Sequence, residues 1–532
     1  MNVQDYNLVL NQDDTKKKIL DGINLAVDII SPTLGNSSRR ILIDHQFSEI
    51  TASDDGHTIL QEISPKDTAV LLGVKIVREV SAQTDKESGD GTTQTAIILR
   101  ELLKQLLKTD SQSEQLIIKK SWTNIKVRKD IKNGLEKVLK YIEDNKVNIE
   151  NKDQIRFVAE TASNSKEIGE MLADMFDKLG PDGSVAVEEG NSVETKSEVV
   201  SGLSWNQGWV APQFITDAER EESVLKDGVN ILVSYKKIQD VDDIKPIADL
   251  FREGLNNILI IANDISGAPL NTLVINKMMG NLRISAVKAN QIGDMKDHLL
   301  DICTATGATL VGDEIPFSEL KLEHFGKSER VIVSKNKTIL VGFGGNKEKI
   351  DERIGLLKNR MKEEQQEYEK NKLSERIAKL TSGVGSIKVG GNTETEIKDK
   401  KAKIDDAVGS VKSAMKYGML PGGGVSFVLA TKVLGDTEGE KMLKNAMLQP
   451  FKTIMENSDI HEDFVPRVLE TGEGYNTETE EWGDVLEMGI VDSAGVLKSA
   501  LSNAVSMSSV VGNVGGSLVL IRKDDDKDKL VE

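Results

Sequence analysis

The sequence predicts a multidomain α+β protein in which an α/β segment is inserted into a mostly helical frame. The chain has 532 residues, more than one hydrophobic core usually accommodates, so two to four domains are expected. Apolar residues recur at helical spacing near both ends of the chain. Between about residues 202 and 383, strand-like and helical segments alternate instead.

The first 200 residues predict mainly helices. Apolar side chains at 19, 23, 26, 27 and 30 lie on one face of a helix expected over 15–31. The helix should stop at "SPTLGNSS", and the strand-like "RILID" (40–44) and the Asp-Gly turn "SDDGHT" (53–58) follow. Helices are expected over much of 65–141, and "SVAVEE" (184–189) reads as a short strand.

The inserted segment contains the buried strands "VNILVSY" (229–235) and "NILIIA" (257–262), with helices expected at 243–254 and 268–279. The charge-rich stretch 352–380 predicts solvated helices, because no heptad persists. Gly202 and Gly383 are the expected hinges. After "IKVGG" (387–391), helices should return through about 511, and the charged tail from 522 should be disordered.

Composition narrows the class of protein. The chain has 68 Lys and Arg against 86 Asp and Glu, a net charge of −18, which argues against a nucleic-acid partner. No apolar run reaches the roughly 18 residues that span a membrane, and the first residues do not resemble a secretory signal. The single cysteine, Cys303, suits the reducing cytoplasm. The five histidines are too scattered to indicate a local metal site.

The stretch "GDGTTQTAIIL" (89–99) indicates a phosphate site. Glycine lets the backbone approach a ligand, and free N–H groups at a helix start favour an anion. Asp90 would repel that anion unless a cation lay between them, and a Mg²⁺-bound polyphosphate removes this conflict. An Asp-Gly turn with a Thr N-cap is the simpler alternative.

Two further segments are candidates for chemistry. "GMLPGGGVSF" (418–427) leaves bare backbone before an apolar helix, or is only a flexible turn. In "KIDDAVGSVKSAMKYG" (403–418), Asp406 lies opposite an apolar helical stripe, either as a solvated residue or as a carboxylate base facing a cleft. "GKS" (326–328) is no P-loop, because Lys321 stands where the first glycine belongs.

These motifs, together with "GYNTETEEWGDVLEMGIVD" (474–492) and "ALSNAVSMSSVV" (500–511), occur in the order and rough spacing of the group I chaperonins, the GroEL family. The segment 201–294 resembles the same family in four further stretches. The resemblance covers nearly the whole chain. It implies an equatorial domain of about 1–145 and 418–532, an intermediate domain of about 146–201 and 384–417, and an apical α/β domain of about 202–383.

The resemblance implies an ATP-driven ring that encloses non-native polypeptides, with seven subunits per ring. The nucleotide site would comprise Thr33, Leu34, Gly35, Asp55, Gly56, Asp90, Gly91, Thr92, Thr93, Gly423, Gly424, Asn476, Ile490 and Asp492. Asp90 would hold Mg²⁺, Asp406 would position and activate the attacking water, and Asp55 would assist. Polypeptide would bind an apolar groove with Trp209, Phe214, Leu270, Leu273, Val274 and Ile275. Without the resemblance, ordinary core is the alternative for all six positions.

Several positions depart from the family pattern. Asp54 stands where the family usually has Lys, which makes the pocket more negative and puts activation by K⁺ in question. Asn36, Ser37 and Ser38 replace the usual Pro-Lys-Gly, and Gln94 replaces a Thr. A divergent member is implied, such as a virus-encoded one in its host's cytoplasm. Ring number and the need for a co-chaperonin lid stay open.

Two other functions fit less of the sequence. A passive holdase would share the fold but have an impaired ATPase, although Asp55, Asp90 and Asp406 are all present. A small-molecule ATP-dependent enzyme, such as a kinase, would need a P-loop or a kinase signature, and this sequence has neither. Such an enzyme would run as a monomer or small oligomer rather than a ring. Steady-state ATP turnover and native mass distinguish the three.

Overall fold

The structure is a computed structural model that describes residues 8–10, 12–44, 51–106, 125–181, 183–190, 192–218, 220–289, 295–364, 366–381, 383–512, 514 and 516–519. The charged tail predicted to be disordered lies outside the described residues. The chain divides into two compact units. The first comprises Met1–Asp174, Asn191–Val193 and Val389–Glu532, and the second comprises Met175–Gly190 and Glu194–Lys388. These boundaries differ from Gly202 and Gly383, and the three-domain division stays a prediction.

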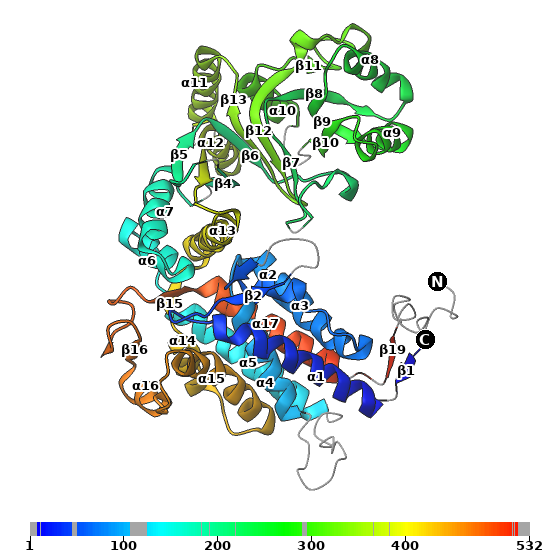
Figure 1. The fold of residues 1–532 in the computed structure, drawn as a ribbon. Helices are drawn as coiled ribbons and strands as arrows, with labels where there is room; N and C mark the ends of the chain where they lie inside the picture. Colours follow the sequence, from blue (N-terminus) through cyan, green and yellow to red (C-terminus); the bar gives the residue numbers. More distant parts are fainter. Residues whose placement is uncertain are drawn as a thin grey trace. The chain divides into compact units, whose positions relative to one another are not determined.

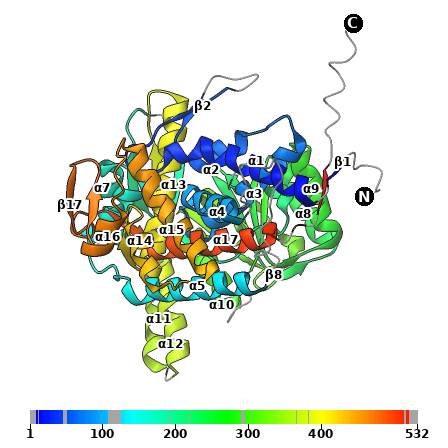
Figure 2. The ribbon, with the colours of Figure 1, turned by 90° about the horizontal axis from the view of Figure 1, so that it is seen from below.

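The first unit is built around a helical bundle with α4 in its middle (Figures 1 and 2). The bundle comprises α1 (Gln12–Ile30), α3 (Thr68–Ser88), α4 (Thr92–Leu106), α5 (Ile125–Asn145), α15 (Glu438–Asn457) and α17 (Ala494–Gly512). Residues 96–99 of α4 are apolar and fully buried because α1, α3, α15 and α17 all pack against this helix, and helical periodicity is therefore weak there. The helices predicted at 15–31 and within 65–141 are therefore present.

The same unit contains a helical pair, α6 (Lys152–Ser163) and α13 (Glu394–Tyr417), packed side by side. Thr393 caps α13 by accepting from the Glu396 N–H, and Gly418 ends the helix. The shorter helices of this unit are α2 (Gly56–Glu62), α14 (Val425–Ala430) and α16 (Val465–Thr471). Helix α7 (Lys166–Leu179) contains the boundary between the two units, which falls between Asp174 and Met175.

The prediction of helices throughout 391–511 is wrong in part. Short strands form two antiparallel pairs, β15 (Met419–Pro421) with β18 (Val491–Ser493), and β16 (Gly474–Asn476) with β17 (Glu481–Gly483). The ring centroids of Tyr475 and Trp482 lie 5.4 Å apart with the rings tilted by 55°, and both rings contact Phe464. This aromatic cluster favours a hairpin over a helix. Two further pairs are β1 (Leu8–Leu10) with β19 (Ser517–Val519), and β2 (Ile41–Ile43) with β3 (Thr51–Ser53).

The second unit is built on an eight-stranded sheet with the order β10-β9-β8-β12-β13-β6, in which β11 also pairs β8 and β7 also pairs β12. Its strands are β6 (Gly202–Trp205), β7 (Ser223–Leu225), β8 (Val229–Ile238), β9 (Asn257–Ile265), β10 (Arg283–Lys288), β11 (Leu310–Val311), β12 (Gly326–Val333) and β13 (Thr338–Phe343). The pairs β8–β9 and β9–β10 are parallel. The strands predicted at 229–235 and 257–262 are confirmed, and "GKS" begins strand β12 rather than a phosphate loop. A separate sheet has the order β4 (Ser184–Glu189), β14 (Val384–Val389), β5 (Lys196–Val200).

Helices cover both faces of the eight-stranded sheet (Figure 1). On β8, Ile231 and Val233 face the core formed with α10 (Met295–Thr306), α11 (Lys347–Glu363) and α12 (Glu367–Thr381). Leu232 faces the opposite core, formed with α8 (Val241–Arg252) and α9 (Gly267–Met278). This alternation is the pleat of a strand buried on both sides.

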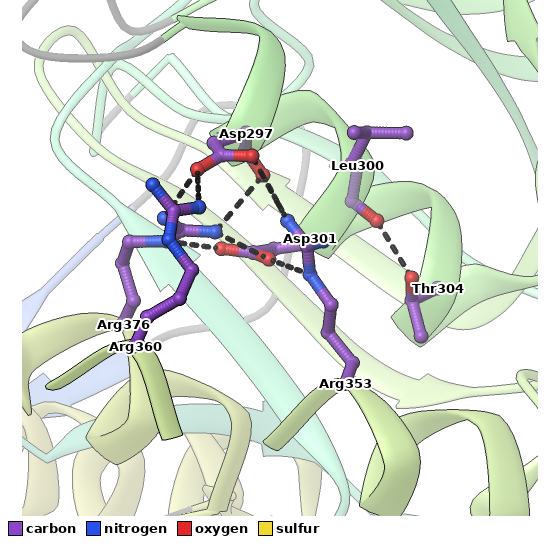
Figure 3. A network of polar contacts seen from close by, with 7 residues as sticks. All are labelled: Asp297, Leu300, Asp301, Thr304, Arg353, Arg360 and Arg376. Carbon is purple, nitrogen blue, oxygen red and sulfur yellow. Dashed lines mark hydrogen bonds and ion pairs between the residues drawn. The ribbon is translucent and has the colours of Figure 1, made fainter. Parts of the chain in front are cut away.

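The charges of α11 and α12 are not simply solvated, as the sequence predicted, because several of them anchor these helices to α10 (Figure 3). Arg353 Nε donates to Asp301 Oδ1 at 2.8 Å, and Arg376 Nε donates to Asp301 Oδ2 at 2.7 Å. Asp297 accepts from Arg360 at 2.8 Å and from Arg376 at 2.9 Å. The two carboxylates are nearly buried, so these ion pairs fix the three helices against each other. Among the described residues, no helix combines the length and the apolar character needed to cross a membrane.

Candidate functional site

A cavity of about 890 Å³ opens within the first unit. The structure brings around it all but one of the residues that the sequence proposed for nucleotide binding and hydrolysis. These are Thr33, Leu34, Gly35, Asp55, Gly56, Asp90, Gly91, Thr92, Thr93, Asp406, Gly423, Asn476, Ile490 and Asp492. The exception is Gly424, which does not line the cavity. A Cβ there would stand 2.8 Å from the backbone of Phe451, so Gly424 lets α14 approach α15.

The loop between α3 and α4 forms one wall of the cavity. Gly89 ends α3 in the left-handed conformation, and α4 begins at Thr92. The Gly91 N–H donates to Asp90 Oδ1, and the Ser410 hydroxyl donates to Asp90 Oδ2 at 2.9 Å. The wall therefore combines an oriented carboxylate with the N-terminus of a 15-residue helix, where backbone N–H groups favour an anion.

Two half-buried carboxyl groups share this wall. Burial raises the pKa of Asp90 to about 6, and its hydrogen bonds to Gly91 and Ser410 offset only part of this effect. Burial also raises the pKa of Asp492 to about 7, and the charge of Asp90 adds to the shift. Two such groups repel each other when both are ionised, so a bound cation would stabilise the site.

The same wall contains two hydrogen-bond acceptors that are not satisfied within the described residues. Asp492 Oδ2 and Gln94 Oε1 are buried, and neither has a hydrogen-bond partner among the described residues. Both residues line the cavity. Because buried acceptors cost free energy when unpaired, a ligand with hydroxyl donors or a divalent cation fits this wall. No group of three or more His, Cys, Asp and Glu with metal-ligand geometry occurs in the described ranges.

Helix α13 lies directly against the loop because two glycines meet. A Cβ on Gly409 would stand 2.5 Å from the Cα of Gly89, closer than side-chain atoms approach. This contact brings Ser410 to Asp90 and places Asp406, one turn earlier, at the cavity. Asp406 is half-buried. The sequence analysis missed Ser410 and the pair of glycines, although Ser410 follows Asp406 by four residues on the same helical face.

The other predicted turn residues have structural partners of their own. Asp55 is the N-cap of α2, and its carboxylate accepts from the N–H groups of His57 at 3.1 Å and Thr58 at 2.8 Å. Asn476 Oδ1 accepts from the Glu478 N–H at 2.9 Å. Gly56 has no room for a side chain, since a Cβ would lie 2.5 Å from the Thr93 hydroxyl. These contacts orient the turns toward the cavity, and they leave less of Asp55 for chemistry.

The loop that carries Thr33, Leu34 and Gly35 is fixed by a side chain that lies far away in the sequence. Thr33 Oγ1 donates to the Ile30 carbonyl at 2.8 Å within the 3₁₀ turn Ser31–Thr33. The Asn457 side chain donates to the carbonyls of Ser31 at 2.9 Å and Leu34 at 2.8 Å. Asn457 was missed, because more than 420 residues separate it from the loop and no local pattern marks it.

The model of the TCP-1/cpn60 chaperonin family matches residues 27–511. The chain belongs to this family. Among solved structures, it is similar to the chaperonin gp146 from the bacteriophage EL 2 (Pseudomonas aeruginosa), at 20% sequence identity over 97% of this chain and 100% of that chain. The TM-scores are 0.68 and 0.61 for two crystal forms, both obtained in the presence of ATP-BeFx. The predicted chaperonin fold is confirmed, in a divergent member.

The second unit of this chaperonin carries the residues predicted to bind polypeptide, and their exposure differs widely. Phe214 is fully buried and Leu273 nearly so, in the core beneath α8 and α9, so neither offers a surface. Leu270, Val274 and Trp209 are half-buried, and the Trp209 indole donates to the Glu221 carbonyl at 3.1 Å. Only Ile275, 51% exposed, offers a largely free apolar side chain.

Two exposed side chains missed by the sequence analysis extend this surface. Met278 and Met279, at the end of α9, are 71% and 70% exposed. A groove of about 360 Å³ runs between α8 and α9, with Ile244, Phe251 and Leu273 among its lining residues. Ile275, Met278 and Met279 therefore form an exposed apolar surface on the second unit of the chaperonin.

Proposed function

We propose that this chaperonin binds Mg²⁺-ATP in the cavity of its first unit, hydrolyses it, and uses the cycle to fold polypeptides captured by its second unit. The observation that carries the proposal is the convergence on one cavity of the α4 N-terminus, Asp90 and Asp406. An anion site, a carboxylate for a cation and a second carboxylate on another helix are the parts that metal-assisted phosphoryl transfer to water requires.

For binding, the free N–H groups of α4 and the Gly91 loop would hold the phosphates, with the hydroxyls of Thr92 and Thr93 beside them. Asp90, held by Ser410, would take the cation through one oxygen. When bound, Mg²⁺ supplies neutralisation of the charge that develops on the phosphates. Asp492 would accept from a sugar hydroxyl, since the residue lines the cavity and one of its carboxylate oxygens has no hydrogen-bond partner among the described residues.

For hydrolysis, Asp406 is the group placed to orient a water molecule and accept its proton. It comes from α13, opposite the loop that would hold the phosphates, and it lines the cavity while remaining half-exposed. Positioning and electrostatics suffice for this reaction, so no covalent nucleophile is needed. Asp55 would act mainly by orienting its turn, because α2 uses both of its oxygens.

For capture, the exposed surface at α8 and α9 would bind apolar segments of unfolded chains. Ile275, Met278 and Met279 expose apolar side chains next to a groove. Flexible methionine side chains adapt to partners of different shape, which suits a surface that must accept many sequences. Helix α8 has Lys245 and Ala248 in its sequence, and neither side chain offers a large apolar group. We therefore expect α9 to contribute most of the binding of unfolded chains.

We further propose a homo-oligomeric ring of seven subunits that acts in the cytoplasm, or in the host's cytoplasm if the chain is phage-encoded. The pairs β1–β19 and β2–β3 are two-stranded within the described residues, so they present strand edges that another subunit can pair. Leu42 of β2 is largely exposed beside one of these edges. A co-chaperonin lid is not required by any of these features.

The test uses Asp406→Asn, with Asp405→Asn as the matched control, because Asp405 precedes it on α13 and does not line the cavity. We expect Asp406→Asn to slow single-turnover ATP hydrolysis roughly 10²–10⁴-fold and to keep ATP affinity, with the control near wild type. Native mass with and without ATP would test the ring. ATP binding without turnover in the wild-type chain would instead support the holdase.

A further inference from the structure

Four charged side chains gather at the rim of the cavity in the first unit. Lys403 Nζ lies 2.9 Å from Asp54 Oδ2 and 3.4 Å from Asp399 Oδ2. Arg40 lies 3.0 Å from the same Asp399 oxygen, and the Ser38 hydroxyl reaches Asp54 at 3.5 Å. The participants come from three separate segments, namely the loop before β2, the turn after β3, and α13.

The group is balanced in charge, and three of its four members are largely withdrawn from water, whereas the Arg40 side chain is 58% exposed. It contains two acids and two bases. The side chains of Asp54, Asp399 and Lys403 are 12%, 10% and 26% exposed. Although burial acts to raise it, the pKa of Asp54 is lowered overall by the Lys403 ammonium, whereas burial and the charge of Asp54 raise the pKa of Asp399. The Lys403 ammonium therefore stabilises the ionised form of Asp54.

This group sits next to both carboxylates of the proposed reaction. Asp54 directly precedes Asp55, and Lys403 precedes Asp406 by three residues, nearly one turn of α13. Asp54, Lys403 and Asp406 all line the cavity. The ion pair thus joins the turn that carries one carboxylate to the helix that carries the other.

We propose that the Asp54–Lys403 ion pair, backed by Asp399 and Arg40, is a latch that holds the N-terminal half of α13 on the cavity and thereby sets the position of Asp406. The inference rests on the proposed ATPase function. Lys403 is a positioning residue in this scheme, since its ammonium is engaged by two carboxylates. The latch and the Gly89–Gly409 contact hold α13 at two points on either side of Asp406.

The test compares Lys403→Met, Asp54→Asn and the exchanged pair Asp54→Lys with Lys403→Asp, which keeps the charges and the combined side-chain length. Lys398→Met is the matched control, because it removes an exposed ion pair with Glu394 on the same helix at 2.7 Å. The rate of amide hydrogen exchange of residues 394–406, measured in the full chain without nucleotide, reports directly how firmly the ion pair holds this half of α13. We expect each single variant to speed this exchange roughly tenfold, and the exchanged pair to restore it.

Single-turnover hydrolysis provides the second measurement. Both single variants should hydrolyse roughly 10–100-fold more slowly with ATP affinity retained, and the exchanged pair should recover most of the rate. Unchanged exchange in both single variants would overturn the latch. So would a loss of ATP affinity in Lys403→Met alone, because Lys403 would then be a phosphate ligand. An inactive wild-type chain would count against the proposed function, while the amide exchange would still decide on the latch.

Discussion

Replacing Gly409 with alanine tests whether the contact between α13 and the phosphate-site loop controls hydrolysis. The new Cβ would stand 2.5 Å from the Cα of Gly89 and 2.8 Å from its carbonyl oxygen, where ordinary contacts begin at 3.4 Å. The helix or the loop must therefore move by about 1 Å. Overpacking costs about 1–3 kcal/mol, and the better helix propensity of alanine returns up to about 1 kcal/mol.

The effect on catalysis should exceed the effect on stability. A misplacement of about 1 Å in a catalytic group can cost roughly 100-fold in rate, and Asp406 lies one turn from Gly409. We expect single-turnover hydrolysis to fall by about that factor, with at most a modest fall in melting temperature. Gly355→Ala on α11 is the control, since nothing lies within 4 Å of its Cβ, and it should stabilise by about 0.5–1 kcal/mol. Wild-type hydrolysis by Gly409→Ala would refute the reasoning.

Three further predictions concern other parts of the chain. The pKa of Asp492 is raised to about 7, so the folded state binds more protons than the unfolded state between about pH 4 and 7, and stability falls as pH rises through this window. Melting temperature without nucleotide should decline less from pH 5 to 8 in Asp492→Asn, and parallel profiles would exclude this effect. Arg376→Met breaks a largely buried ion pair and should destabilise the second unit by roughly 3 kcal/mol in denaturant titrations. Arg252→Met, at an exposed pair, should change stability by less than about 0.5 kcal/mol, and equal losses would show that burial is irrelevant. Ile275→Ser combined with Met278→Ser should weaken capture of an unfolded protein at least about tenfold and leave ATP turnover intact. Unchanged capture would place the binding surface elsewhere.

What the sequence could predict was local. The "GDGTT" loop combines glycine, a carboxylate and helix-capping hydroxyls within five residues, and the stripe around Asp406 follows from helical spacing alone. Both patterns depend on neighbours in the chain, so they survive into the structure. The other residues of the cavity were predicted only from the resemblance to the chaperonin family.

What the sequence could not predict was contact across long separations. The bond from Ser410 to Asp90 spans 320 residues, and the pair of Asp54 with Lys403 spans nearly 350. Phe214 lies in a loop and was taken for surface, yet neighbouring strands and helices bury it completely. The hairpin around Tyr475 depends on aromatic packing rather than on periodicity, which is why helices were predicted there.

The way in which the chain builds its first unit bears on how a subunit is made. Helix α4 is synthesised early, but its neighbours α15 and α17 come from the last hundred residues. At about 5–20 residues per second, the 331 residues between Leu106 and Glu438 take roughly 17–66 s to synthesise. The second unit draws almost all of its residues from one continuous stretch and can close during this interval. The apolar faces of α1, α3 and α4 cannot be fully buried until α15 and α17 have been synthesised. During this period each nascent subunit exposes apolar surface, as do the unfolded chains that its family binds.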